Sequence, residues 1–147
     1  MATHEQRNAM ATRITVSTTV LRPIDQVWAC WTDPAHITRW NAASGDWHCP
    51  KASNDLRAGG RFISTMTARD GSFSFDFEGV YDAVEANARI AYTMSDGRTC
   101  EVRFEPVTDG TRVTESFDAE TKNPVELQRQ AWQAILDRFK AHAETCS

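Results

Sequence analysis

A series of strand-like segments followed by one long amphipathic segment constrains the fold more than any other feature of the sequence. Hydrophobic and polar residues alternate through five consecutive segments, a period of two that is typical of half-buried strands. The five segments are Arg61–Arg69, Ser72–Glu85, Arg89–Ser95, Thr99–Val107 and Thr111–Ala119. Asp-Gly dipeptides beginning at positions 70, 96 and 109 separate three pairs of neighbouring segments. Because glycine accepts the positive φ of tight hairpin turns, the series predicts an antiparallel meander.

The segment after the meander has helical periodicity. It begins with an Asn-Pro dipeptide at position 123, and apolar residues recur every fourth position at Leu127, Ala131, Ile135 and Phe139. Charged residues occupy the opposite side of the helical wheel. The pattern predicts one amphipathic helix over roughly residues 124–143.

A strand and two short helices are expected ahead of the meander. β-Branched residues alternate through Arg13–Val20, which favours a strand. Pro23 suits the first turn of one helix and Pro34 the first turn of a second. Residues 41–60 carry a weak signal that ends in a sharp bend at Gly59-Gly60. Residues 1–11 are expected to form a disordered tail, and residues 12–147 a single domain.

This order of elements predicts an α+β fold in which a curved antiparallel sheet wraps around the long C-terminal helix. A sheet that is apolar on one face must cover that face, and the last helix is the only predicted element long enough to do so. A strongly curved sheet leaves a space beside the helix. The two short helices after the first strand, together with the loops, are expected to form the mouth of that space.

Composition excludes several classes of protein. The 147 residues carry a net charge of −4, whereas a nucleic-acid binder needs a basic face. No apolar run reaches the length of about 18 residues that indicates a membrane span. The first eleven residues lack the apolar stretch of a signal peptide, so a cytoplasmic protein with four reduced cysteines is expected. His36, His48 and Cys49 lack the spacing of zinc ligands, so neither a metal nor another cofactor is expected.

Two motifs resemble a known family. They are Pro23-Ile-Asp-Gln-Val-Trp-Ala-Cys-Trp-Thr-Asp-Pro34, followed by Trp40, and Asp55-Leu-Arg-Ala-Gly-Gly-Arg-Phe62. Both are similar to bacterial proteins related to the activator of the ninety-kilodalton heat shock protein ATPase, in the START-like, or SRPBCC, superfamily. Gly79-Val-Tyr81, Tyr92-Thr93 and Trp132 fit as well, and the resemblance covers roughly residues 12–143. Ala131 precedes Trp132 where the family commonly has glycine, a mild departure.

The resemblance implies the helix-grip fold of the birch pollen allergen and a hydrophobic cavity without an assigned reaction. The wider superfamily includes lipid carriers, hormone receptors and polyketide cyclases, so a lipid-like ligand lies within the expected range and the fold leaves the function open. The chaperone name is inherited from a eukaryotic relative and is not taken as the function.

Strand alternation and the helical stripe predict which side chains face the space between sheet and helix. They are mostly apolar or aromatic, with few polar groups, which is the composition of a small-molecule site. The expected cavity residues are Trp47, Phe62, Ser64, Met66, Phe75, Phe77, Tyr92, Met94, Val102, Phe104, Glu115, Phe117, Trp132 and Leu136. Taken singly, each apolar member is more typical of core packing.

Glu115 is the most informative of these residues. Val113, Glu115 and Phe117 alternate on the expected inward face, and an inward carboxylate is costly unless it is hydrogen-bonded, paired or hydrated. One interpretation is a polar anchor or acid–base group in the cavity, with a pKa raised by desolvation. The other is an edge position or a structural ion pair. The candidate partners for such a pair are Arg61, Arg98 and Arg103.

Three functions are compatible with these patterns, in the following order. The first is a module that binds a small hydrophobic or aromatic ligand. The second is an enzyme of the cyclase, dehydratase or hydrolase kind that uses Glu115 with Tyr92 as acid and base. The chain has no recognisable nucleophile motif, which favours binding over catalysis and leaves no catalytic residue assigned. The third is a co-chaperone-like interaction module with a chaperone partner, and a homodimer also stays open.

Overall fold

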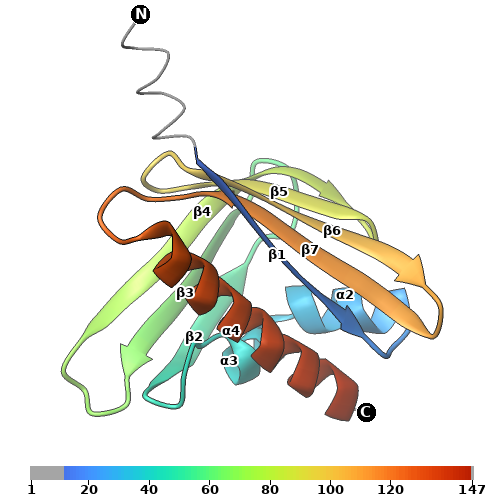
Figure 1. Ribbon diagram of the computed structural model, residues 1–147, viewed down its shortest axis with the longest axis horizontal. Coiled ribbons are helices and arrows are strands. Elements are labelled where there is room, and N and C mark those ends of the chain that lie inside the picture. Colours follow the sequence, from blue (N-terminus) through green and yellow to red (C-terminus); the bar gives the residue numbers. More distant parts are fainter. Residues whose placement is uncertain (1–11, 147) are drawn as a thin grey trace, which may run out of the picture.

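The computed structural model describes residues 12–146 and confirms the α+β helix-grip architecture. One seven-stranded antiparallel sheet curves around a long C-terminal helix, and two short helices lie on the same concave side (Figure 1). The strands are β1 (Arg13–Val20), β2 (Trp47–Asn54), β3 (Arg61–Ala68), β4 (Ser74–Glu85), β5 (Arg89–Met94), β6 (Thr99–Val107) and β7 (Gly110–Asp118). The helices are α2 (Ile24–Thr32), α3 (Pro34–Trp40) and α4 (Val125–Thr145). The tail expected at residues 1–11 lies outside the described residues.

The strands β2 to β7 form an antiparallel meander, and the first strand, β1, pairs with the last strand, β7. The strand order is β1-β7-β6-β5-β4-β3-β2, and every neighbouring pair is antiparallel. β1 pairs with β7 along its whole length, from Arg13 opposite Asp118 to Val20 opposite Thr111. The two edges of the sheet are therefore β1 and β2, which the two short helices connect along the chain (Figure 1).

The five strands of the predicted meander are all present, and the structure adds β2 where the sequence signal is weak. Pro50 lies within β2, and the pairing of β2 with β3 shifts register between His48 and Lys51. Proline is tolerated at a sheet edge or a bulge because no neighbouring strand needs its missing N–H group. The bulge also interrupts the alternation of side chains, which is why periodicity does not identify this strand.

Helix α4 approaches the sheet most closely at the β1 edge. Three of its long polar side chains donate hydrogen bonds to alternate backbone carbonyl oxygens of β1. These are Arg129 to Thr15 at 3.2 Å, Gln133 to Ser17 at 3.2 Å and Lys140 to Thr19 at 2.7 Å. The bonds satisfy acceptors that an edge strand leaves unpaired, and they fix the helix to one side of the concave face.

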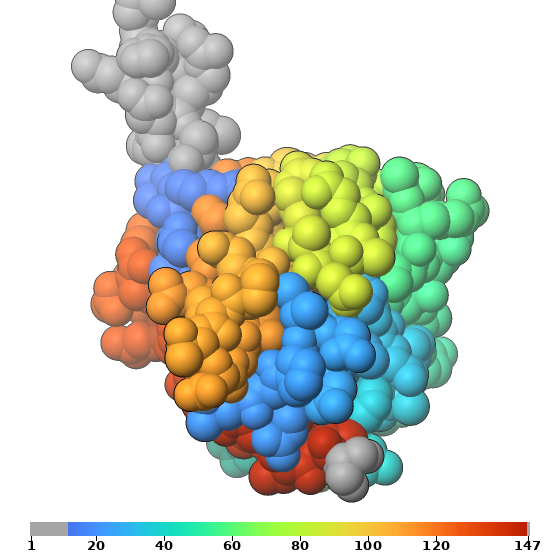
Figure 2. Space-filling model, turned by 90° about the vertical axis from the view of Figure 1, so that its right-hand side faces the viewer, coloured from blue at the N-terminus to red at the C-terminus, as the bar shows by residue number. Residues whose placement is uncertain are grey.

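The hydrophobic core is most tightly filled beneath this side of the sheet. Phe117 of β7 and Trp132 of α4 stack with ring centroids 3.7 Å apart. Phe117, Phe139 and Leu136 are fully buried. In the space-filling view, α2 (blue) lies at the surface between the β6–β7 hairpin (orange) and the end of α4 (red), so that it covers this end of the core (Figure 2). Among the described residues, no helix is both long enough and apolar enough to cross a bilayer.

Candidate functional site

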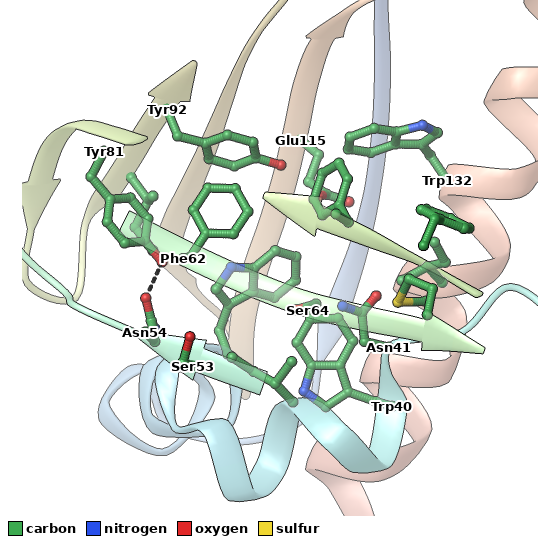
Figure 3. Close-up of a pocket in the computed structure, with 17 residues that line it drawn as sticks. Trp40, Asn41, Ser53, Asn54, Phe62, Ser64, Tyr81, Tyr92, Glu115 and Trp132 are labelled. Atoms are coloured by element: carbon green, nitrogen blue, oxygen red, sulfur yellow. Dashed lines mark hydrogen bonds between the residues drawn. The ribbon is translucent and has the colours of Figure 1, made fainter. Parts of the chain in front are cut away.

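A pocket opens on the other side of the concave face, between the sheet, α3 and α4. Its volume is about 200 Å³, and strands β2 to β5 and β7 contribute to its wall. The lining residues are Trp31, Ile37, Trp40, Asn41, Ser53, Asn54, Phe62, Ser64, Met66, Phe75, Phe77, Tyr81, Ile90, Tyr92, Glu115, Trp132 and Ile135. Figure 3 shows their side chains converging on a shared space from the sheet and from the helices.

The pocket brings together eight of the residues that the sequence analysis expects in a cavity. They are Phe62, Ser64, Met66, Phe75, Phe77, Tyr92, Glu115 and Trp132. All come from β3, β4, β5, β7 and α4, the elements with the clearest periodicity. Phe75 lies at the rim, since 45% of its surface is exposed.

The other six expected residues do not line the pocket. Phe104 packs edge-on against Trp28 and Trp31, with ring centroids 5.2 and 5.9 Å away. Trp47 packs against Phe73 and Phe75, with ring centroids 6.2 and 5.8 Å away. The remaining four are buried in the hydrophobic core: Met94, Val102, Phe117 and Leu136.

Nine lining residues are not among the cavity residues that the sequence predicts. Ser53 and Asn54 come from β2, whose weak signal hides them, and Trp31, Ile37, Trp40 and Asn41 come from the two short helices and the residue after them. Tyr81, Ile90 and Ile135 complete the set. The Tyr81 hydroxyl donates a hydrogen bond to the Asn54 side-chain oxygen, and the Asn54 amide nitrogen donates to the Thr32 carbonyl at 2.7 Å. These bonds connect β4, β2 and the end of α2 at the mouth, as Figure 3 shows for the first of them.

Aromatic rings form most of one wall. The ring of Phe62 lies at the centre of this wall, with the centroids of Phe77, Tyr81 and Tyr92 at 5.7, 5.3 and 4.8 Å. Gly79 of β4 lies opposite Phe62 in the strand pairing, and a Cβ atom there would stand 2.8 Å from the Phe62 ring. The absence of a side chain at Gly79 therefore leaves the space that the Phe62 ring occupies beside β4.

Glu115 is the one carboxyl group in the pocket wall. It lies on β7 between Val16 of β1 and Val102 of β6, and only 5% of its surface is exposed. Across residues 12–146, no hydrogen bond or ion pair is found for its side chain. Each arginine considered as a partner pairs with another carboxylate: Arg61 with Glu78, Arg98 with Asp96 and Arg103 with Glu101.

Burial decides the protonation of the polar groups in the pocket. Desolvation raises the pKa of Glu115 to about 8, so the carboxyl group is mostly neutral at neutral pH. Desolvation also raises the pKa of Tyr81 to about 12 and, with smaller contributions from Cys100 and Glu115, the pKa of Tyr92 well above its ordinary value. The pocket therefore presents neutral hydroxyl and carboxyl groups that donate and accept hydrogen bonds.

The lining residues favour recognition over covalent chemistry. None of the 17 lining residues is a histidine, cysteine, lysine or arginine. Ser64 and the tyrosine hydroxyls therefore have no basic side chain beside them in the wall to activate them as nucleophiles. In Figure 3 the Tyr92 hydroxyl points toward the side of the pocket where Glu115 lies. Glu115 and the tyrosine hydroxyls are the groups in the wall that can transfer protons.

A curved antiparallel sheet that holds a C-terminal helix beside a pocket defines a helix-grip domain of the START-like class. Residues 22–144 match the family described as Activator of Hsp90 ATPase homolog 1-like protein. Because that match covers most of the chain, the protein belongs to this family.

Solved structures agree with this assignment. An AHSA1-like protein from Aeromonas hydrophila is 45% identical, with a TM-score of 0.86 over 90% of this chain and 92% of that chain. A protein from Cytophaga hutchinsonii is 53% identical, with a TM-score of 0.79 over 90% and 92% of the two chains. A protein from Chromobacterium violaceum shares the fold, with 22% identity and a TM-score of 0.81 over 92% and 99%. No curated protein matches the chain.

Proposed function

We propose that the protein binds a small aromatic or largely apolar molecule carrying one hydrogen-bonding group, and that this group contacts Glu115. The observation that carries the proposal is the Glu115 carboxyl group, which lies in a largely apolar pocket wall and has no hydrogen-bond or ion-pair partner among residues 12–146. No side-chain nitrogen or oxygen of the described residues is fully buried without a partner, so the Glu115 oxygens are accessible from the pocket. A ligand that forms a hydrogen bond with the carboxyl group would gain about 1 kcal/mol over one that does not, which gives the site its selectivity.

The size of the pocket limits the ligand. A cavity of about 150 Å³ lined by apolar side chains binds benzene, whereas pockets for drug-sized ligands occupy about 300–1,000 Å³. The volume of about 200 Å³ suits a molecule of one or two fused rings. A long-chain lipid would require the helices at the mouth to move apart.

The polarity of the pocket suggests an orientation. Glu115 lies on the inner wall, whereas Asn54 and Ser53 lie on the edge strand β2 near the mouth. The rings of Phe62, Phe77 and Tyr92 provide the apolar surface on the sheet side. Burial of a flat ring against them contributes about 25 cal/mol per Å² of apolar surface removed from water.

The test compares 2-naphthol with naphthalene, which differ by one hydroxyl group. NMR chemical-shift changes would report the affinity of each probe and the residues that it contacts. We expect 2-naphthol to bind about tenfold more tightly, because a hydrogen bond in the pocket is worth about 1 kcal/mol or slightly more. In Glu115→Leu this preference should disappear while naphthalene still binds. Glu105→Leu, which removes an exposed carboxylate on β6, serves as the matched control.

The proposal fails if neither probe shifts residues of the pocket, or if Glu115→Leu retains the preference for 2-naphthol. Failure of both probes would favour the co-chaperone-like interaction module. The exposed rings of Phe73 and Phe75, at 59% and 45% exposure, are the surface to examine in that case.

A second candidate function is acid–base catalysis of the cyclase, dehydratase or hydrolase kind. The pKa of about 8 for Glu115 lies close to neutral pH, where a group both donates and accepts a proton readily. The two functions separate in Glu115→Gln, because an amide still forms hydrogen bonds but transfers no proton. Turnover of a bound compound that is lost in Glu115→Gln, with binding retained, would identify an enzyme.

A further inference from the structure

Four potential metal ligands meet at the end of the molecule where α2, α3 and the C-terminal end of α4 come together. They are Cys30 of α2, His36 of α3, His142 of α4 and Cys146, the residue that caps α4. Each offers one donor atom, and all four donor atoms lie within 4.8 Å of one another. Two sulfur and two imidazole nitrogen donors are the combination found in tetrahedral zinc sites.

The distances within this cluster are close to those of a tetrahedral site. His36 Nδ1 and His142 Nε2 are 2.9 Å apart, and Cys146 Sγ lies 3.7 Å from His36 Nδ1. Zn–N bonds of about 2.0–2.1 Å and Zn–S bonds of about 2.3 Å place the ligand atoms of a tetrahedron about 3.3–3.8 Å apart. A small separation of the two imidazoles, which now share a hydrogen bond, would therefore make room for the ion.

The surrounding structure holds the donors in place. The Trp40 indole N–H donates to the backbone carbonyl of Cys30 at 2.9 Å, which links α3 to α2. The backbone N–H of Cys146 donates to the His142 carbonyl at 2.9 Å, which holds Cys146 against the last turn of α4. Cys30 is buried, and the other three donors are partly buried. The site is thus shielded but still open to an ion from solvent.

We propose that Cys30, His36, His142 and Cys146 form a Zn²⁺ site that fastens the end of α4 to α2 and α3. On binding, the two thiols release their protons to solvent, and the resulting thiolates balance the two positive charges of the ion. Both imidazoles bind as neutral ligands. Spacing along the sequence predicts no metal site, because spacing does not reveal ligands that come from separate elements of the fold.

The site would also affect the pocket. α3 carries His36 beside Ile37, and Ile37 and Trp40 line the pocket. An ion bound to His36 would hold this wall against the end of α4. The metal would therefore stiffen the mouth without contacting a ligand in the pocket.

The experiment titrates the full chain, freed of metal by a chelator and kept reduced, with Co²⁺ and then Zn²⁺. We expect one equivalent of Co²⁺ to give the strong visible absorption of tetrahedral cobalt together with sulfur-to-cobalt charge-transfer bands. Zn²⁺ should displace the cobalt and raise the melting temperature, because an ion that binds only the folded state stabilises it.

Two ligand variants and one matched control test the assignment. Cys146→Ser and His142→Gln should each weaken Co²⁺ binding by more than about 100-fold, beyond the effect of losing an outer-shell partner. Cys49→Ser removes a buried cysteine of β2 that lies outside the cluster, and it should leave binding unchanged. Circular dichroism would establish that each variant is folded.

Three results would overturn the proposal. The first is a titration without tetrahedral cobalt bands in the unmodified protein, which needs no variant to interpret. The second is equal metal binding in Cys146→Ser and Cys49→Ser. The third is formation of a Cys30–Cys146 disulfide in air, seen as the loss of two hydrogens by mass, together with no metal binding after reduction.

Discussion

The two halves of the concave face differ in how completely their side chains fill the space. Under β1, β7 and β6, Phe117 stacks directly on Trp132 at 3.7 Å, and Phe139 is fully buried. Under β3, β4 and β5, the rings of Phe62, Phe77 and Tyr92 line a pocket of about 200 Å³. Both halves are aromatic, so residue type alone does not determine which one is filled.

The position of α4 explains the difference. Its polar side chains bind the carbonyl groups of β1 and hold the helix on that edge of the sheet. The opposite half is covered by α3 and by the far side of α4, through Trp40, Ile37 and Ile135. A helix fixed at one edge of a curved sheet fills the near half and leaves a space in the other half. The contact of α4 with the edge strand β1 therefore shapes the pocket.

The largest expected effect is that of a charge placed in the filled half. Phe104 is 4% exposed and packs against Trp28 and Trp31. We expect Phe104→Lys to cost about 4–5 kcal/mol or more, because the ammonium group would be buried without a partner. Phe77→Lys on the pocket side should cost much less, since its chain can extend into a hydrated space. Urea denaturation measures both, and equal losses would remove the distinction between the halves.

Neighbouring residues on α4 permit a matched truncation. Leu136 is fully buried, whereas Ile135 is half-buried and lines the pocket. Leu136→Ala should lower the free energy of unfolding by about 2–5 kcal/mol, because the lost methyl groups leave a cavity in a packed core. Ile135→Ala should cost about 1 kcal/mol, since much of the space around it is already open. Chemical denaturation would decide, and a larger loss for Ile135→Ala would contradict the comparison.

The buried Glu115 makes stability depend on pH. Desolvation raises its folded-state pKa to about 8 from an ordinary 4.5, so between these values the native state binds more protons than the unfolded state. Stability should therefore fall as pH rises from about 4.5 toward 8, by a total on the order of several kcal/mol, and then level off. At pH 7, Glu115→Gln should be more stable than the unmodified protein by roughly 2–3 kcal/mol.

Urea denaturation at pH 5 and pH 8 measures this dependence. Glu105→Gln, at an exposed position of β6, is the control and should keep the pH dependence of the unmodified chain. An unchanged pH dependence in Glu115→Gln would mean that the carboxyl group is hydrated.

The smallest expected effect on stability comes from adding volume to the open half. Ile135→Phe should change the free energy of unfolding by less than about 1 kcal/mol, because the added ring enters the pocket. Leu136→Phe, one residue further along α4, should cost about 1–3 kcal/mol by overpacking the filled half. Ile135→Phe should also abolish binding of 2-naphthol. Thermal melts and NMR titration check both effects, and tight binding by Ile135→Phe would place the ligand elsewhere.

Much of the fold follows from local patterns. The strands β3 to β7 show a period of two, and the turns at Gly71 and Gly97 have the positive φ that glycine favours. Apolar residues recur every fourth position along α4, and this helix ends within two residues of its predicted end. The third hairpin differs in detail. Asp109 takes the positive φ, and Gly110 is required because a Cβ atom would stand 2.3 Å from the Val20 carbonyl oxygen. That carbonyl belongs to β1, so a distant strand determines the need for glycine.

The candidate site is predictable only where periodicity is strong. Alternation along β7 correctly predicts that Glu115 points inward with Val113 and Phe117, since side chains two apart share a face. Alternation does not distinguish Phe77, which lines the pocket, from Phe104, which packs in the core. Ser53 and Asn54 are missed because β2 contains a proline and a bulge.

Local patterns along the chain predict the order of every element except β2, the inward face of the periodic strands and the inward position of Glu115, because these depend on residues close together in the chain. The packing of the elements in three dimensions determines which half of the concave face is filled and brings Cys30, His36, His142 and Cys146 together. Both features depend on where α4 lies against β1, α2 and α3. That placement results from packing and hydrogen bonds between residues more than 100 positions apart, such as Gln133 with Ser17 and His142 with His36, which local periodicity does not record.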